Sequence, residues 1–244
     1  MVTSAATFTL SAPTATPVPA VPAAESVAVG TRGGSPYVAL GDSYASGAGP
    51  AGVKDAKCDC TSGSYPSLIA KLRSVTGARA TTRDFWNSRG SILPQIDALT
   101  PDTGLVTLTL GGNDVGFSGV LADIRRRSPH AKVIVVGYPA LFPDDGVACP
   151  EVPFAKGDFA CLRDTTTKAD RALERQAVAA GAGTSFADTY TPTIGHDMCR
   201  PRDGRWIESL TPAPNTMAAH ANTLGQSVMA ASALWQIYQP FHRP

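Results

Sequence analysis

The sequence predicts an α/β fold with a parallel central sheet, and three observations predict it. Short apolar stretches of strand length alternate with longer stretches of helical spacing. One of the short stretches, residues 132–137, is apolar almost throughout, as is typical of a strand that is buried on both faces of a parallel sheet. The chain has 244 residues, which is enough for one domain with a substantial core.

Each expected element follows from its own pattern. Apolar runs rich in β-branched residues indicate strands, and polar-rich runs of helical spacing indicate helices that cover a face of the sheet. In chain order, the expected elements are strands at 38–40, 105–110 and 132–137, a helix at 164–180, a strand at 184–187 and a helix from 221 to about 238.

The first 35 residues differ in composition from the rest. Up to residue 30 they consist mainly of Ala, Thr, Val, Pro and Ser, with no charged side chain before Glu25. Such a segment cannot bury a core and is expected to stay extended. It has neither the basic start nor the leucine-rich middle of an ordinary secretory signal, so it is a trimmed or atypical signal, or a linker. We therefore expect a flexible segment at 1–35 and one folded domain at 36–244.

The overall charge and hydropathy argue against two classes of partner. The formal net charge is +1, which gives no strong attraction to nucleic acid or to an anionic membrane surface. No apolar run approaches the length of a membrane-spanning helix. We therefore expect a soluble protein that binds no nucleic acid and has no transmembrane segment.

A serine surrounded by small residues follows the first expected strand. Gly41 and Gly47 flank Ser43 and let the chain turn sharply. Ser43 is therefore expected at the carboxyl end of the strand, where open α/β sheets place their ligand crevices, and a nucleophile would lie there. By itself the pattern is also that of an ordinary turn with a capping serine.

Two further blocks agree with a nucleophile at Ser43. The strand at 105–110 runs into Gly111-Gly-Asn-Asp114, which presents an amide and a carboxylate, and His220-Ala-Asn-Thr-Leu-Gly225 opens the last helix. In this order, the three blocks resemble those of the SGNH hydrolase family, also called GDSL esterases and lipases. Minor motifs at 64–68, 136–139 and 195–199 resemble its secreted actinobacterial lipase and phospholipase branch.

The resemblance implies a three-layer α/β/α flavodoxin-like fold with a parallel central sheet, and the hydrolysis of carboxylic acyl esters. Ser43 is then the nucleophile and His220 the base, and neither a metal nor a cofactor is needed. The expected oxyanion hole contains the backbone amides of Ser43 and Gly90, with Arg89 as the neighbouring alternative to Gly90, and the side-chain amide of Asn113. Asn113 also suits this role chemically, because an amide donates without a change of charge.

Other polar residues near these blocks are expected to be structural. His130 is expected in a solvated turn, His242 in a proline-bounded tail, and His196 in a structural motif. Asp42 and Asp114 are expected to tie neighbouring turn amides together.

The histidine block departs from the family pattern at the place of the triad acid. Many relatives carry an aspartate three residues before the histidine, and this chain has Met217 there. Some actinobacterial relatives work with a Ser-His dyad in which a backbone carbonyl orients the imidazole. The carbonyl of Met217 or of Ala218 is therefore our candidate for holding the Nδ1 proton of His220.

Five cysteines favour an exported protein, because all lie in expected loops or loop edges, which suits disulfides. Cys58 and Cys60 are too close for an easy bond, and the usual partner of Cys58 in the resembling relatives is missing here. The other three allow one bridge, from Cys199 to Cys149 or Cys161, and an odd count leaves at least one cysteine unpaired. A zinc site is disfavoured, because the spacing fits no compact finger.

The sequence therefore predicts a secreted serine esterase of the lipase, phospholipase A or esterase type. It is expected to act as a monomer, through an acyl-enzyme intermediate, on a small-molecule or lipid ester. Two alternatives stay open: a noncatalytic binding protein on the same scaffold, motivated by the missing acid, and a carbohydrate acetylesterase. The motifs do not specify the acyl chain or the alcohol, because this scaffold hosts several ester specificities.

Overall fold

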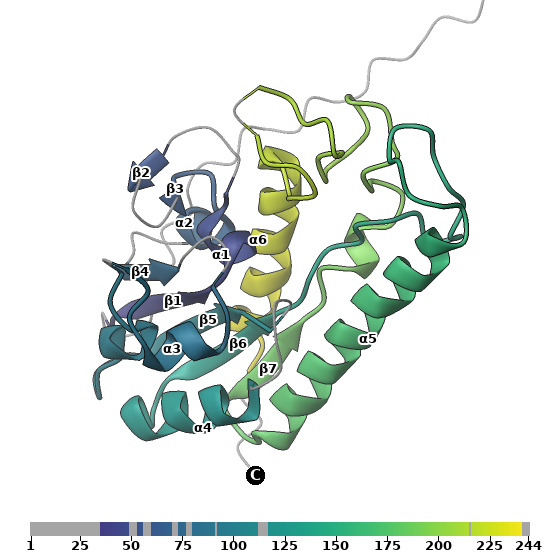
Figure 1. The fold of residues 1–244 in the computed structure, drawn as a ribbon. Helices are drawn as coiled ribbons and strands as arrows, with labels where there is room; N and C mark the ends of the chain where they lie inside the picture. The colour runs from purple at the N-terminus through teal and green to yellow at the C-terminus, as the bar shows by residue number, and fades with distance from the viewer. Residues whose placement is uncertain are drawn as a thin grey trace, which may run out of the picture.

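Five parallel strands form the central sheet, in the spatial order β4-β1-β5-β6-β7 (Figure 1). The computed structural model describes residues 35–48, 53–55, 60–69, 73–76, 80–90, 92–111, 117–214 and 216–240. The five strands are β1 (Tyr37–Gly41), β4 (Arg73–Thr76), β5 (Leu105–Thr109), β6 (Lys132–Val136) and β7 (Thr184–Ala187). All but residue 35 of the expected flexible segment at 1–35 lies outside the described residues.

The strand order contains one change of direction. From β1 the chain adds β4 on one side, and it then adds β5, β6 and β7 in succession on the other side. This is the flavodoxin-like order, which confirms the expected fold. In such sheets the carboxyl ends of β1 and β5 flank the crevice at the change of direction, and ligands bind there.

Helices cover the sheet in two further layers (Figure 1). The helix α6 (Thr223–Tyr238) packs against β6, β7 and α2 (Tyr65–Ile69). The helix α5 (Asp158–Ala179) packs against β6, β7 and α4 (Phe117–Arg127). Because crossovers between parallel strands are right-handed, the helices that join β5, β6 and β7 lie on one face, and α2 and α6 lie on the other. The result is a three-layer α/β/α domain.

Six short elements complete the described part of the chain. They are the helix α1 (Ser43–Ser46), the antiparallel pair β2 (Val53–Asp55) and β3 (Cys60–Thr61), the helix α3 (Arg83–Trp86), and the 3₁₀ turns η1 (Gln95–Ala98) and η2 (Thr191–Thr193). None of the helices in the described ranges is long and apolar enough to cross a membrane.

The core lies on both faces of the central strands. Val38, Leu40 and Leu108 are fully buried, as expected for strands that helices cover on both sides. Two threonines of β5 are buried as well, and each meets a tyrosine hydroxyl: Thr107 Oγ1 lies 2.7 Å from the hydroxyl of Tyr37, and Thr109 Oγ1 lies 2.9 Å from that of Tyr65. These pairings keep the buried hydroxyls hydrogen-bonded.

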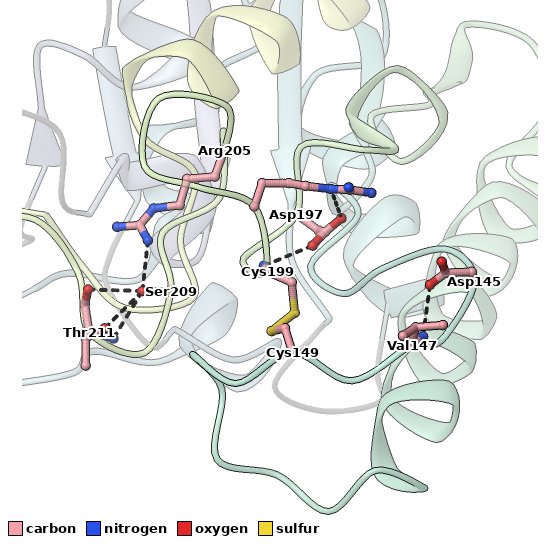
Figure 2. Close-up of a disulfide and its surroundings, with 9 residues drawn as sticks. Asp145, Val147, Cys149, Asp197, Cys199, Arg205, Ser209 and Thr211 are labelled. Atoms are coloured by element: carbon pink, nitrogen blue, oxygen red, sulfur yellow. Dashed lines mark hydrogen bonds and ion pairs between the residues drawn. A yellow bond between two sulfur atoms is a disulfide. The ribbon is translucent and has the colours of Figure 1, made fainter.

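Two loops that follow strands of the sheet are joined by a disulfide between Cys149 and Cys199, whose Cα atoms are 5.6 Å apart (Figure 2). The bridge is one of the two pairings expected, and Cys161 is a free, exposed cysteine. On loop-closure grounds, a bridge over 50 residues stabilises the fold by about 4 kcal/mol. Cys60 is also disulfide-bonded, a bridge that the sequence did not predict. Cys58 lies outside the described residues.

Candidate active site

The nucleophile candidate lies at a sharp turn after β1. Gly41 ends this strand with φ of 141°, and a Cβ atom there would lie 2.2 Å from the carbonyl oxygen of Thr109. Ser43 is the first residue of α1, so its backbone N–H has no carbonyl partner within the helix. Asp42 caps this helix by accepting a 2.9 Å hydrogen bond from the amide of Tyr44. Glycine is therefore required where the turn approaches β5, and Ser43 follows directly at the crevice.

His220 meets Ser43 across 177 residues of sequence. The Nε2 atom of the imidazole lies 2.7 Å from the Oγ atom of Ser43, and the Nδ1 atom lies 2.8 Å from the carbonyl oxygen of Ala218. Because a carbonyl oxygen only accepts, Nδ1 must carry the proton, which leaves the lone pair of Nε2 facing the serine hydroxyl. This is the geometry of a nucleophile next to its base.

The two carbonyls considered for the Nδ1 proton are placed differently. The oxygen of Ala218 lies against Nδ1, whereas the oxygen of Met217 accepts a 3.3 Å hydrogen bond from the backbone amide of His220. Both carbonyls therefore stabilise the turn at His220. Of the two, the carbonyl of Ala218 is the one that is hydrogen-bonded to the imidazole.

The segment before α6 is held by pairing with residues 206–208. Glu208 N–H donates to the carbonyl of His220, and Ala219 N–H donates to the carbonyl of Glu208. Asn222 caps α6 by accepting from the amides of Leu224 and Gly225. A Cβ atom at Gly225 would lie 2.5 Å from the carbonyl oxygen of Trp206. In this block the asparagine therefore caps α6, and the glycine allows the start of α6 to lie close to the backbone of Trp206.

A cavity of about 350 Å³ opens beside the serine and the histidine. Its walls come from the turn after β1, from the segment after β6, from α5 and from the histidine turn. The lining residues are Asp42, Ser43, Tyr44, Tyr138, Leu141, Thr165, Thr166, Ala169, Met217 and His220. Such a volume, with apolar walls and two reactive groups at one side, suits a small ligand or one end of a longer one.

Asp42 is a buried carboxyl group beside this cavity. Burial raises its pKa to about 6, against the opposing effect of the 2.5 Å hydrogen bond that the hydroxyl of Tyr138 donates to its Oδ2 atom. Together with the bond from the amide of Tyr44, this contact joins the nucleophile turn to the segment after β6. As expected, Asp42 ties together the backbone of the turn, while Asp114 lies outside the described residues.

The expected oxyanion hole is only partly described. The amide of Ser43 lies at the start of α1, next to the nucleophile. Gly90 lies in an exposed turn between Arg89 and Ile92, with φ of 59°, and it is not among the residues that line the cavity. Asn113 lies outside the described residues. The roles of Gly90 and Asn113 therefore stay predictions.

The other histidines lie elsewhere. His196 stacks on Trp206 with ring centroids 3.4 Å apart, and its Nδ1 atom lies 2.7 Å from the carbonyl oxygen of Gly204. His130 is exposed, and His242 lies outside the described residues. In the ranges that the structure covers, no three His, Cys, Asp or Glu side chains are placed to hold one metal ion.

The residue that sequence reasoning missed is Tyr44, which follows the nucleophile directly. Its ring stacks on the imidazole of His220 with centroids 4.7 Å apart and an interplanar angle of 21°. An aromatic side chain next to the serine was the only signal in the sequence, and it does not say which neighbour the ring contacts.

The chain is similar to known lipases. A model of the GDSL-like lipase/acylhydrolase family matches residues 39–228. Among curated proteins, the chain is 33% identical to lipase 2 of Streptomyces coelicolor, covering 80% of this chain and 83% of that protein. It is 30% identical to a lipase of Streptomyces rimosus, covering 78% and 82%.

Two solved structures share the fold. The extracellular lipase from Streptomyces rimosus matches with a TM-score of 0.66 and 26% identity, covering 82% of this chain and 99% of its own. Phospholipase A1 from Streptomyces albidoflavus matches with a TM-score of 0.69 and 26% identity, covering 82% and 98%.

Proposed function

The chain belongs to the GDSL-like lipase/acylhydrolase family and is a carboxylic ester hydrolase, and we propose that it works through a Ser43–His220 dyad and an acyl-enzyme intermediate. The observation that carries this proposal is the 2.7 Å contact between Ser43 Oγ and His220 Nε2, with Nδ1 held by a carbonyl oxygen on the far side of the ring. That arrangement fixes both the tautomer and the direction of the base.

The reaction has two halves. Ser43 Oγ attacks the ester carbonyl as Nε2 of His220 takes its proton, and the charge on the carbonyl oxygen is held by the amides of Ser43 and Gly90 and by Asn113. The imidazolium then gives the proton to the leaving alcohol, and the acyl-enzyme forms. Water attacks the acyl-enzyme while Nε2 takes the water proton, and the same proton returns to Ser43 as the carboxylic acid departs.

Three carboxylates of the C-terminal region have partners of their own. Asp188 Oδ1 accepts from the amides of Tyr190 and Thr191. Asp197 is buried and accepts from the amide of Cys199, and Glu208 is buried against the guanidinium of Arg205 at 2.7 Å. Their contacts are those of structural carboxylates, which supports orientation of His220 by the carbonyl of Ala218.

We therefore predict that no single carboxylate in this region is catalytically indispensable. The isosteric variants Asp188→Asn, Asp197→Asn, Asp203→Asn and Glu208→Gln should each keep kcat within about tenfold of wild type, because a main-chain oxygen holds the Nδ1 proton. The measurement is steady-state hydrolysis of a p-nitrophenyl ester by variants whose circular dichroism matches wild type. Loss of turnover in one correctly folded variant would identify that residue as the triad acid.

Met217→Asp is the matched gain experiment, since it restores an acid at the place where relatives carry one. The variant is expected to stay active, with a modest rise in kcat if the carboxylate reaches Nδ1, because an ionised carboxylate stabilises the imidazolium better than a neutral carbonyl does.

The cavity supports an aliphatic acyl ester as substrate. Leu141, Ala169 and Met217 give it apolar walls next to the reactive serine, and an acyl chain gains from contact with such walls. The names of the relatives, lipase and phospholipase A1, support the same substrate class. A sugar ester would instead present hydroxyl groups to these apolar side chains at a cost in desolvation.

The test combines labelling with a substrate panel. Stoichiometric labelling by a fluorophosphonate is expected in wild type and not in Ser43→Ala, because the probe needs a live nucleophile. A panel of p-nitrophenyl esters from acetate to palmitate, with phosphatidylcholine and acetylated xylan, then ranks the substrates. Preference for acetylated xylan would replace the lipid or aliphatic ester proposal with a carbohydrate acetylesterase.

We also propose that the enzyme is secreted and acts as a monomer. The Cys149–Cys199 bridge supports export, because disulfides persist in oxidising compartments. The relative from Streptomyces rimosus is an extracellular lipase, which supports the same location.

A further inference from the structure

Tyr44 contacts the histidine turn in two ways at once. Its ring lies against the imidazole of His220, and its hydroxyl donates a 2.6 Å hydrogen bond to the carbonyl oxygen of Ala219, the residue directly before the histidine. We propose that Tyr44 is a positioning residue that holds the imidazole and its backbone turn in the geometry needed to activate Ser43. This inference rests on the proposed dyad and assigns a role to a side chain outside it.

The backbone at Ala219 explains why the hydroxyl matters. Ala219 has φ of 59°, in the left-handed region of backbone conformation that residues other than glycine seldom occupy. Such a conformation persists only where surrounding contacts hold it. Both polar groups of this residue are bonded: its N–H donates to the carbonyl of Glu208 at 3.0 Å, and its carbonyl accepts from Tyr44.

This turn also aims the carbonyl that orients the base. Ala218 precedes the left-handed residue and His220 follows it. The change in chain direction at Ala219 brings the carbonyl oxygen of Ala218 to 2.8 Å from the Nδ1 atom of His220. Relaxation of Ala219 towards an ordinary conformation would turn this oxygen away from the ring. The hydroxyl of Tyr44 therefore acts on the imidazole through the backbone, in addition to the direct contact of its ring.

The ring contact has a further effect during the reaction. The imidazole becomes positively charged when it takes the serine proton, and the face of an aromatic ring attracts a cation. The ring of Tyr44 is itself held edge-on by Tyr138, with centroids 5.1 Å apart and an interplanar angle of 88°. Burial keeps the pKa of the Tyr44 hydroxyl well above its ordinary value, so the hydroxyl stays a donor.

Tyr44 is also covalently linked to the nucleophile. Ser43 and Tyr44 are consecutive residues of α1, and the amide of Tyr44 is fixed by the carboxylate of Asp42. The helix α1 therefore carries the nucleophile and, through Tyr44, also contacts the base. The contact between Tyr44 and His220 therefore helps to set the distance between Ser43 Oγ and His220 Nε2, although the two residues are 177 positions apart in the sequence.

The experiment separates the two contacts with two substitutions. Tyr44→Phe keeps the ring and removes the hydroxyl, and we expect kcat to fall by about twofold to tenfold, as for the loss of one hydrogen bond. Tyr44→Leu removes both contacts, and we expect kcat to fall by about tenfold to a hundredfold. KM should stay within about twofold of wild type in Tyr44→Phe, because this variant keeps the ring that lines the cavity and loses only the hydroxyl that acts on the histidine turn.

Tyr37→Phe is the matched control. Tyr37 is also a buried tyrosine whose hydroxyl is hydrogen-bonded, but it lies at the start of β1, away from the carboxyl edge of the sheet. It should lose stability without losing kcat. Thermal unfolding of all three variants, and of wild type, measures how far each change affects the fold.

The outcomes are distinct. A graded loss of kcat that is smaller in Tyr44→Phe than in Tyr44→Leu, with KM unchanged in Tyr44→Phe, supports the proposal. Wild-type kcat in Tyr44→Leu, or a loss no larger than that of Tyr37→Phe at the same change in stability, overturns it. Fluorophosphonate labelling of wild type, with Ser43→Ala as the blank, tests the dyad separately, since an unlabelled wild type would refute the proposed function itself.

Discussion

Ser43→Ala and His220→Ala are each expected to lower kcat by at least about a thousandfold, with little further loss in the double variant. The physical reason is that the hydroxyl and the imidazole act as one unit: without the base the hydroxyl is a weak nucleophile, and without the hydroxyl the base has nothing to activate. Steady-state hydrolysis of a p-nitrophenyl ester measures the effect, with purified protein of confirmed fold.

Matched controls keep this result specific. His130→Ala and Ser227→Ala remove an exposed histidine and an exposed serine, the latter on α6, and neither residue lines the cavity. Both should retain wild-type turnover. Comparable turnover in Ser43→Ala or in His220→Ala would rule out the dyad, and additive losses in the double variant would mean that the two side chains act separately.

The second large effect is expected at Asn113. Asn113→Ala should lower kcat by roughly a hundredfold to a thousandfold with little change in KM, because an oxyanion donor is used mainly when charge develops on the substrate oxygen. Asn87→Ala, which truncates an exposed asparagine on a short helix end, is the control and should leave kcat unchanged.

The kinetic pattern decides what Asn113 does. A rise in KM at constant kcat would mean that its amide binds the ground-state substrate, and an unchanged kcat and KM would remove it from the site.

Much of the fold could be predicted because its central strands are covered on both faces. The segments that form β5 and β6 are rich in apolar and β-branched residues. Each observed strand ends one residue before its predicted end. The strand β7 has the predicted bounds, Thr184–Ala187. Burial on two faces leaves a continuous apolar signal, which a sequence displays directly.

Elements at the edge of the sheet and on its surface were harder to predict. The strand β4, Arg73–Thr76, carries no apolar run and takes its place at the edge of the sheet only by pairing with β1. The helix α4 was not predicted, and α5 begins at Asp158, six residues before the predicted start. Tertiary packing decides such elements more than local propensity does.

The candidate site shows the same division. Ser43 and His220 lie beside glycines and a helix cap that mark special backbone positions, so the sequence was enough to propose them. The choice between the carbonyls of Met217 and Ala218 depends on the left-handed backbone of Ala219. Alanine carries no sequence signal for that conformation, so only the three-dimensional structure could decide it.

The separation of the two proposed catalytic residues along the chain bears on when activity appears during folding. Ser43 lies at the turn after β1, the first strand of the domain, whereas His220 precedes α6, which packs against β6 and β7. Contacts between such distant residues form late, because closing the long intervening chain costs entropy. This cost is offset only when the other contacts of the fold have formed. Recovered turnover therefore reports the last stage of refolding, whereas recovered helix content reports earlier ones.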